Sequence, residues 1–342
     1  MHVEPPSPYS PPESPTPASP IPAERSLWWW LLGGAVYGIT MRLLFGWLPE
    51  SWQGAMSTGF LVGTPLAIGA LTVYGARQRD RPWLFAIFAP WVTTLLMLAG
   101  CALMLLEGAI CLAIMTPLFL LCASLGGVAM QAALRVVRRH APLRAVAALP
   151  LLLLLGEQII PPATDHVTLQ HSVDIAADPA VVWQQIMEAR DIRADELPFS
   201  ITHAIGVPRP LQGVNLATAD GEYRFSRWEK GVHFRAKVID AVPLHRSSWQ
   251  YEFAPDSFPP GSMDDHVAVG GRYFHLQGST FTLTPIGPGH TRLQLQARFR
   301  LTTSLNGYAV PVARWLGSDF VSTILGLYKG RSERATQQSL SR

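Results

Sequence analysis

The sequence predicts an α-helical transmembrane bundle followed by a water-soluble α+β domain. Long apolar runs with few charges occupy the chain from about residue 26 to residue 161. From residue 165 onward, acidic and basic residues are interspersed as they are in an ordinary globular domain. This second half alternates apolar and polar residues with the period of β-strands, and it closes with an amphipathic helical stripe. Because polarity changes so abruptly, we expect the two halves to occupy different solvents.

The two ends of the chain are expected to lie outside the folded parts. Residues 1 to 25 are dominated by Pro and Ser, which favour extended polyproline II and cannot bury a core. We predict a disordered Pro-rich tail there, and its P-x-x-P spacing could alternatively dock an aromatic groove. Residues 337 to 342 are expected to form a flexible C-terminus.

Between residues 26 and 161 we predict a transmembrane region of four to five helices. A helix needs about 20 apolar residues to cross about 30 Å of hydrocarbon. Four runs approach that length, at about residues 27 to 48, 55 to 75, 83 to 106 and 108 to 133. A fifth run at 145 to 160 is shorter and contains Glu157. It either crosses the membrane or lies on its surface.

Arginines in the loops predict the orientation, because Lys and Arg are retained on the cytoplasmic side of short loops. The loops after the second and fourth runs are basic, whereas the alternate loops have neither Lys nor Arg, so both basic loops should be cytoplasmic. The basic residues are Arg77, Arg79, Arg81, Arg135, Arg138, Arg139 and Arg144. Five spans would make this a multi-pass protein of the plasma (inner) membrane with an extracytoplasmic C-terminal domain. Four spans would leave that domain in the cytosol.

Two charged residues lie apart from the basic loops, Arg42 in the first run and Glu107 between the third and fourth, and three thiols lie within the apolar runs. Arg42 and Glu107 are expected to snorkel to the membrane interface, with an ion pathway as the alternative. Cys101, Cys111 and Cys122 have no metal-site spacing and are interpreted as small buried hydrophobes.

The second half predicts a curved antiparallel sheet around a long helix. A strand near residues 167 to 175 is followed by a helix with Asp178 as N-cap and Pro179 as its first residue. A helix from about Asp319 to Glu333 would cover the apolar face of the sheet. Further strands are predicted at Glu222 to Trp228, Val232 to Val242, Ser247 to Phe253, Gly271 to Gln277, Ser279 to Pro285 and Thr291 to Leu301.

Two stretches of this half resemble a known superfamily. HSVDIAADPAVVWQQIME, from His171, is similar to the first strand and helix of START-like (SRPBCC) proteins, which include polyketide cyclases, pollen-allergen-type proteins and lipid-transfer domains. HTRLQLQARFRL and FVSTILGLYKGRSER, from His290 and Phe320, are similar to its last strand and long helix. The resemblance covers about residues 165 to 336 and implies an α+β helix-grip (START-like) soluble domain. It also implies an apolar cavity for lipids, sterols, hormones or polyketides, without a universal catalytic residue.

Aromatic and apolar residues on the predicted inner faces are the candidates for lining such a cavity. Aromatic residues there could equally fill a core. Tyr273 and His275 alternate along one predicted strand, and His275 could act as an acid or base near neutral pH, although a lone His is more often structural. The loop at 254 to 266 could overhang the cavity mouth or be a plain surface loop. The candidates are Trp183, Phe234, Trp249, Tyr251, Tyr273, His275, Phe299, Phe320, Ile324 and Tyr328.

The motifs of several other functions are missing from the sequence. It has no H-E-x-x-H zinc motif, Gly-rich phosphate loop or G-x-S-x-G elbow, so we expect no metal, no cofactor and no assignable catalytic residue. The formal net charge of +3 is spread over both halves, so nucleic acid is not an expected partner.

The preferred hypothesis is a membrane-tethered START-like domain that binds or presents a hydrophobic small molecule, with membrane lipids as partners. One alternative is a cyclase- or dehydratase-like enzyme that uses Tyr273 and His275 in the same cavity. The other is a non-catalytic membrane interaction module with a filled core.

Overall fold

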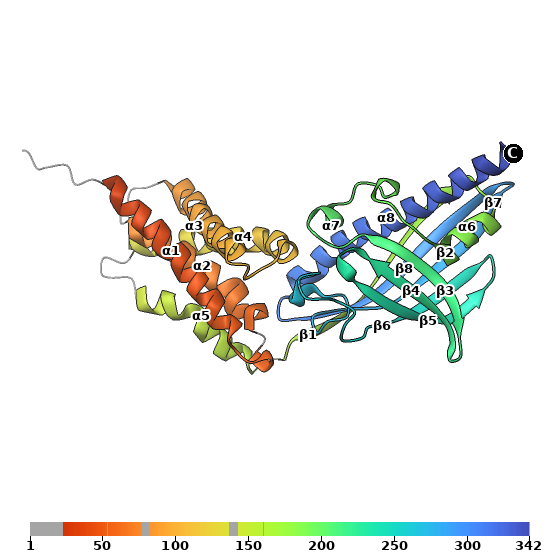
Figure 1. The fold of residues 1–342 in the computed structure, drawn as a ribbon. Helices are drawn as coiled ribbons and strands as arrows, with labels where there is room; N and C mark the ends of the chain where they lie inside the picture. The colour runs from red at the N-terminus through yellow and green to blue at the C-terminus, as the bar shows by residue number, and fades with distance from the viewer. Residues whose placement is uncertain (1–22, 53, 77–81, 137–142, 160, 342) are drawn as a thin grey trace, which may run out of the picture.

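The computed structural model describes residues 23–52, 54–76, 82–136, 143–159 and 161–341. These residues form a helical lobe followed by a sheet domain wrapped around one long helix (Figure 1). Most of the Pro-rich tail predicted for residues 1 to 25 lies outside the described residues. The same is true of five of the loop arginines on which the orientation depends, Arg77, Arg79, Arg81, Arg138 and Arg139.

The described residues of the helical lobe form five α-helices that pack through small residues. Gly69 and Gly126 let α2 and α4 approach closely, because an added Cβ would lie 1.9 Å from the Ala123 carbonyl oxygen and 2.0 Å from the Leu66 carbonyl oxygen, respectively. A π-helical turn at Gly59–Gly63 leads into α2. The helices are α1 (Ala23–Gly46), α2 (Thr64–Ala76), α3 (Trp83–Leu103), α4 (Ala109–Val136) and α5 (Leu143–Glu157).

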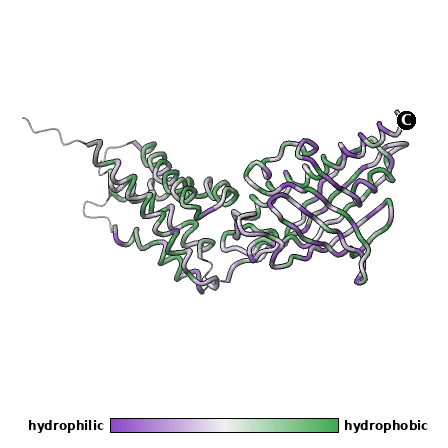
Figure 2. The backbone as a smooth tube through the Cα atoms, viewed as in Figure 1, coloured by the Kyte–Doolittle hydropathy of each residue, from purple (hydrophilic) through white to green (hydrophobic). Residues whose placement is uncertain are grey.

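Among its described residues, three segments of this lobe are long and apolar enough to cross a membrane. They are Gly59–Ala76, Trp83–Leu103 and Ala109–Val136, which match the second, third and fourth predicted runs. Hydrophobic residues run along these helices in Figure 2. Spans at α1 and α5 remain predictions. Large apolar side chains are exposed on the outside of the lobe, including Trp28, Trp29, Leu32, Leu84, Phe88, Leu95, Leu121, Leu125, Leu152 and Leu155.

The polar residues inside the lobe differ in part from expectation. Arg42 and Glu107 form an ion pair with each other and are both largely buried, which the sequence did not predict. Their expected place at the membrane interface stays a prediction. The Arg42 Nη2 also donates to the Leu106 carbonyl oxygen at 2.9 Å. Pairing removes the cost of holding either charge alone in an apolar environment. All three cysteines, Cys101, Cys111 and Cys122, are free and buried, as predicted.

The C-terminal half forms an eight-stranded antiparallel sheet in the order β1-β8-β7-β6-β5-β4-β3-β2. The sheet curls around α8 (Figure 1), which confirms the expected α+β domain with a sheet gripping its C-terminal helix. Helices α6 (Pro179–Met187) and α7 (Ile201–Ala204) lie in the connections. The strands are β1 (Ala163–Ile175), β2 (Glu188–Ala189), β3 (Pro210–Thr218), β4 (Gly221–Trp228), β5 (His233–Val242), β6 (Arg246–Glu252), β7 (Phe274–Gly287) and β8 (His290–Thr303).

Four elements differ from the sequence predictions. The two strands expected at 271 to 277 and 279 to 285 are one strand, β7, with an irregular register between Leu276 and Gly278. Strands β2 and β3 were not expected, because their sequences alternate weakly. Helix α8 extends over Asn306–Leu340, beyond both predicted ends, so most of the C-terminus expected to be flexible is helical.

Apolar side chains of the inner sheet face, α6 and α8 form the domain core. The aromatic ring of Trp249 packs on Phe281, and Phe281 in turn contacts Tyr328 of α8 edge-on. Other buried members of this cluster are Ile175, Val182, Ile186, Leu293, Leu295, Val321, Leu325 and Leu327.

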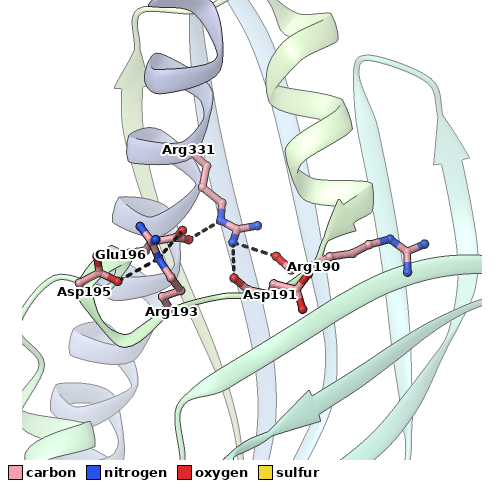
Figure 3. A network of polar contacts seen from close by, with 6 residues as sticks. All are labelled: Arg190, Asp191, Arg193, Asp195, Glu196 and Arg331. Carbon is pink, nitrogen blue, oxygen red and sulfur yellow. Dashed lines mark hydrogen bonds and ion pairs between the residues drawn. The ribbon is translucent and has the colours of Figure 1, made fainter. Parts of the chain in front are cut away.

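A polar network holds α8 against the loop that follows β2 (Figure 3). The Arg331 Nε donates to the Glu196 carboxylate at 2.6 Å. The Arg331 Nη2 donates to the carbonyl oxygens of Arg190 and Asp191 at 2.9 and 3.1 Å. Arg193 pairs with the same Glu196 at 3.7 Å. These contacts lie near β2 and α6, at the end of the domain remote from the helical lobe (Figure 1).

Candidate ligand cavity

A cavity of about 300 Å³ lies between the curled sheet and α8. Its walls are mainly apolar and come from β1, β3 to β8 and α8, together with residues of the helical lobe. The volume is at the lower end of the roughly 300 to 1,000 Å³ that is usual for small-molecule sites.

Small residues on α8 leave this space open. Ala309, Ala313 and Gly317 line the cavity and recur every four residues, so they share one face of the helix. At Gly317, an added Cβ would lie 2.6 Å from the Leu169 Cδ1. Larger side chains along this row would fill the gap between the helix and the sheet.

One end of the cavity is polar and centred on Arg224 of β4. Its side chain is buried, with the residue only 6% exposed. The Arg224 Nη1 donates to the Ile186 carbonyl oxygen at 2.7 Å and to Asn215 Oδ1 at 3.1 Å, and Nη2 donates to Tyr328 Oη at 2.9 Å. The guanidinium also lies over the Trp249 ring, 4.5 Å from its centroid.

Two further polar residues of this end come from β6 and β7. Tyr251 Oη donates to Ser279 Oγ at 3.0 Å, and both residues line the cavity. Burial raises the pKa of Tyr251, against the lowering effects of the Ser279 bond and the nearby Arg224 charge. The phenol is therefore neutral at ordinary pH and acts as a hydrogen-bond donor.

The other end of the cavity meets the helical lobe. Tyr308, near the start of α8, lines this end, and its hydroxyl donates to the Ile114 carbonyl oxygen at 2.5 Å. Tyr308 and Tyr328 are 20 residues apart on α8, or about 30 Å at 1.5 Å per helical residue. The cavity therefore runs lengthwise along α8. Its lining from the helical lobe is apolar: Met56, Leu61, Ile110, Ile114, Met115 and Leu118.

Polar contacts join the two lobes around this end. The Asp264 Oδ2 accepts a hydrogen bond from the Cys111 backbone N–H of α4 at 2.8 Å. Glu157, at the end of α5, accepts from the Thr58 backbone N–H at 2.7 Å and from the Ser304 hydroxyl. Met263 and His266, from the loop predicted to overhang a cavity mouth, line the cavity. That loop is therefore part of the junction with the helical lobe.

Eight of the ten predicted cavity residues line the cavity: Phe234, Trp249, Tyr251, Tyr273, Phe299, Phe320, Ile324 and Tyr328. Trp183 instead packs against the core from α6. Strand β7 begins at Phe274, and Phe274 and Leu276 line the cavity in place of His275. His275 contacts Phe253 edge-on at 5.8 Å. Binding of a ligand by any of these residues remains a prediction.

Sequence reasoning missed Arg224 and the contribution of the helical lobe. In β4, the larger apolar residues Tyr223 and Phe225 alternate with Arg224 and Ser226, so simple alternation favours the wrong face. The structure directs Arg224 and Ser226 to the cavity, and Phe225 is exposed. The alternation itself was a usable signal. The polar residues Arg224 and Ser226 share one face of β4, and a cavity with a polar end can be lined by that face.

Among the described residues, no three His, Cys, Asp or Glu side chains come together as a possible metal site. No protein-family model and no curated protein match the chain. Solved structures match its C-terminal half. A START superfamily protein from Mycobacterium smegmatis is 15% identical over 50% of this chain and 99% of its own, with a TM-score of 0.33.

Two further solved structures are similar at a comparable level. The Zhui aromatase/cyclase from Streptomyces sp. R1128 is 16% identical over 51% of this chain and 98% of its own, with a TM-score of 0.32. Norcoclaurine synthase from Thalictrum flavum is 12% identical over 59% of this chain and 95% of its own, also with a TM-score of 0.32.

Proposed function

We propose that this chain is a membrane-tethered protein whose C-terminal domain binds a hydrophobic small molecule or lipid. The observation that carries the proposal is the long apolar cavity along α8, one end of which is lined by the helical lobe. An apolar space of this size stabilises an apolar ligand by removing its surface from water, at about 25 cal/mol per Å². The interaction module with a filled core predicts no such space.

The membrane is the proposed source of the ligand. Three apolar helical segments and the exposed apolar side chains on the outside of the lobe support insertion into a bilayer. A lipid that enters the cavity from the bilayer would contact the apolar residues Ile110, Ile114 and Met115 of the helical lobe before it reached the sheet. Tethering also raises the effective concentration of the domain at the membrane.

We propose five spans, with the C-terminal domain outside the plasma (inner) membrane. The start of α4 and the end of α5 both contact the sheet domain, through the Cys111–Asp264 and Glu157–Ser304 hydrogen bonds, which supports a common outer face. A Ser341→Cys variant in intact cells should react with a membrane-impermeant maleimide, since the three native thiols are buried. Labelling only after permeabilisation would place the domain in the cytosol and reject five spans.

Native mass spectrometry of the full chain released from detergent micelles tests binding. We expect wild-type protein to retain a discrete apolar molecule, identified after denaturation. The Ala313→Trp variant, which fills the space beside α8, should lose it. Gln338→Trp adds the same ring at an exposed position of α8 and should retain it. A wild-type protein that stays empty after incubation with a membrane lipid extract would reject the proposal.

The cyclase- or dehydratase-like alternative has less support. It relied on Tyr273 and His275 facing one cavity, but only Tyr273 lines it. We therefore do not propose catalysis.

A further inference from the structure

The polar end of the cavity contains a buried cation without an acidic partner. Arg224 is 6% exposed, and no ion pair among the described residues joins it to an Asp or Glu. Its acceptors are a backbone carbonyl, an amide oxygen and a phenol, all of them neutral. Asn215 in turn donates to the exposed Glu222 at 2.9 Å, so this carboxylate is linked to Arg224 through an amide. Burying a charge is costly unless an opposite charge accompanies it.

Hydrogen-bond donors around Arg224 remain unused. Three hydrogen bonds, two from Nη1 and one from Nη2, use three of the five N–H donors of its guanidinium. Tyr328 accepts from Arg224, and within the described part of the chain no acceptor is found for the Tyr328 hydroxyl proton. The Trp249 Nε1–H is buried without a partner among the described residues, and Trp249 is 2% exposed. Buried polar groups are normally satisfied, so this excess of donors requires an explanation.

We propose that the ligand is an amphiphile with one anionic head group, a carboxylate or a phosphate, that binds Arg224 while its hydrocarbon chain extends along α8 toward the helical lobe. This inference rests on the proposed function and specifies its ligand class. An anionic oxygen accepts several hydrogen bonds and supplies the missing negative charge, which matches a site composed of donors. A neutral, purely apolar ligand would neither balance the charge of Arg224 nor accept hydrogen bonds from the unused donors.

The remainder of the cavity fits the hydrocarbon chain. From Tyr328 toward Tyr308 the lining becomes mainly apolar, and the distance along α8 is about 30 Å. A bilayer hydrocarbon core of about 30 Å contains two leaflets, so one acyl chain reaches about 15 Å. The cavity is therefore long enough for a head group at Arg224 and one acyl chain directed toward Met115 and Ile114.

A competition experiment with the full chain in detergent tests the head-group assignment. Hexadecanoate, hexadecyl phosphate and hexadecanol share one chain and differ in their head groups, and retention of each is quantified by native mass spectrometry. We expect at least one anion to be retained at least tenfold better than hexadecanol. The Arg224→Gln variant should lose at least tenfold of that anion and keep its hexadecanol binding. Comparison of the two anions distinguishes a carboxylate from a phosphate source.

Matched variants separate charge recognition from misfolding. Arg227→Gln removes an exposed arginine from the same strand and should bind like wild type, whereas Arg224→Lys should recover part of the anion binding. Tyr328→Phe removes one donor without removing the charge and should weaken anion binding alone, which keeps the test available if Arg224→Gln does not fold. Equal retention of all three amphiphiles by wild type would overturn the head-group assignment but leave the proposed function intact. Retention of none would reject both.

Discussion

The Asp264 carboxylate accepts a 2.8 Å hydrogen bond from the Cys111 backbone N–H, so a loop of the sheet domain caps the first turn of α4. The first N–H groups of a helix have no intrahelical acceptor, and the helix dipole favours a negative charge beside them. Because the same loop lines the cavity through Met263 and His266, this cap holds the domain against the helical lobe where the cavity meets it.

Replacing Asp264 with alanine should loosen this junction. The loss of a helix cap costs about 0.5–2 kcal/mol, so amide hydrogen exchange in the first turn of α4 should become faster. Exchange measured by mass spectrometry on the full chain in detergent checks this. Asp256→Ala, an exposed change in the same loop, serves as the control. Unchanged protection of residues 110 to 113 in Asp264→Ala would show that the bond does not hold the junction.

The order and type of most elements could be predicted from the sequence because their local patterns are strong. The strand β1 was predictable from its clean alternation of apolar and polar residues. The helix α6 was predictable because Asp178-Pro179 is a typical helix start. The inward-facing positions of β7 change phase between Leu276 and Gly278, where its register is irregular. The strand continues through this bulge, so two predicted strands are one. A shift of one residue reverses every side chain, which explains why His275 was assigned to the wrong face.

The cavity itself was less predictable. Its polar end depends on Arg224 meeting Tyr328, which lies 104 residues later in the chain. Its apolar end depends on docking of α4 and the turn near Met56 against the sheet domain. Neither contact has a local signature, because sequence periodicity reports which face of an element is apolar and not which distant element covers it.

The Arg331 network, at the end of the domain remote from the helical lobe, should contribute measurably to stability. Arg331→Met preserves much of the apolar stem but removes charged hydrogen bonds to Glu196 and to two backbone carbonyls. We expect a loss of about 1.5–3 kcal/mol in the free energy of unfolding. Denaturant unfolding followed by tryptophan fluorescence measures it. The largely exposed Arg193 provides the control, since Arg193→Met should change stability by no more than about 0.5 kcal/mol. Equal losses in both variants would contradict a special role for Arg331.

Gly213 should be required for the position of Arg224. A Cβ added at Gly213 would lie 2.4 Å from the Arg224 Nη2 and 2.9 Å from its Cζ, so Gly213→Ala must displace the guanidinium. We expect weaker binding of the anionic amphiphile with hexadecanol binding unchanged, measured in the same competition. Gly287→Ala is the matched control, because an added Cβ there meets nothing within 4 Å. Wild-type anion binding by Gly213→Ala would argue against a fixed guanidinium.

His203 should make the domain less stable in mild acid. Burial lowers the pKa of His203 from its ordinary value of 6.5, and the nearby Arg209 also lowers it, against the raising effects of the Val207 bond, Glu229 and Asp319. Nδ1 lies 3.0 Å from the Val207 carbonyl oxygen and therefore donates to it, while Nε2 has no partner among the described residues. As pH falls below about 6.5, the unfolded chain takes up a proton before the folded one. The stabilising contribution is full above that pH and is lost as pH falls through the lower folded-state pKa.

Thermal unfolding of the full chain at pH 7.5 and pH 5.5 measures this effect of His203. Other groups also titrate in this range, so the informative quantity is the difference between variants. His203→Asn offers an amide N–H in place of Nδ1–H but cannot take up the proton, so its melting temperature should fall less between the two pH values than that of wild type. His245→Asn, at an exposed site with a similar bond to a backbone carbonyl, should behave like wild type. If the melting temperature of His203→Asn fell as much as that of wild type, the acid sensitivity would originate from groups other than His203.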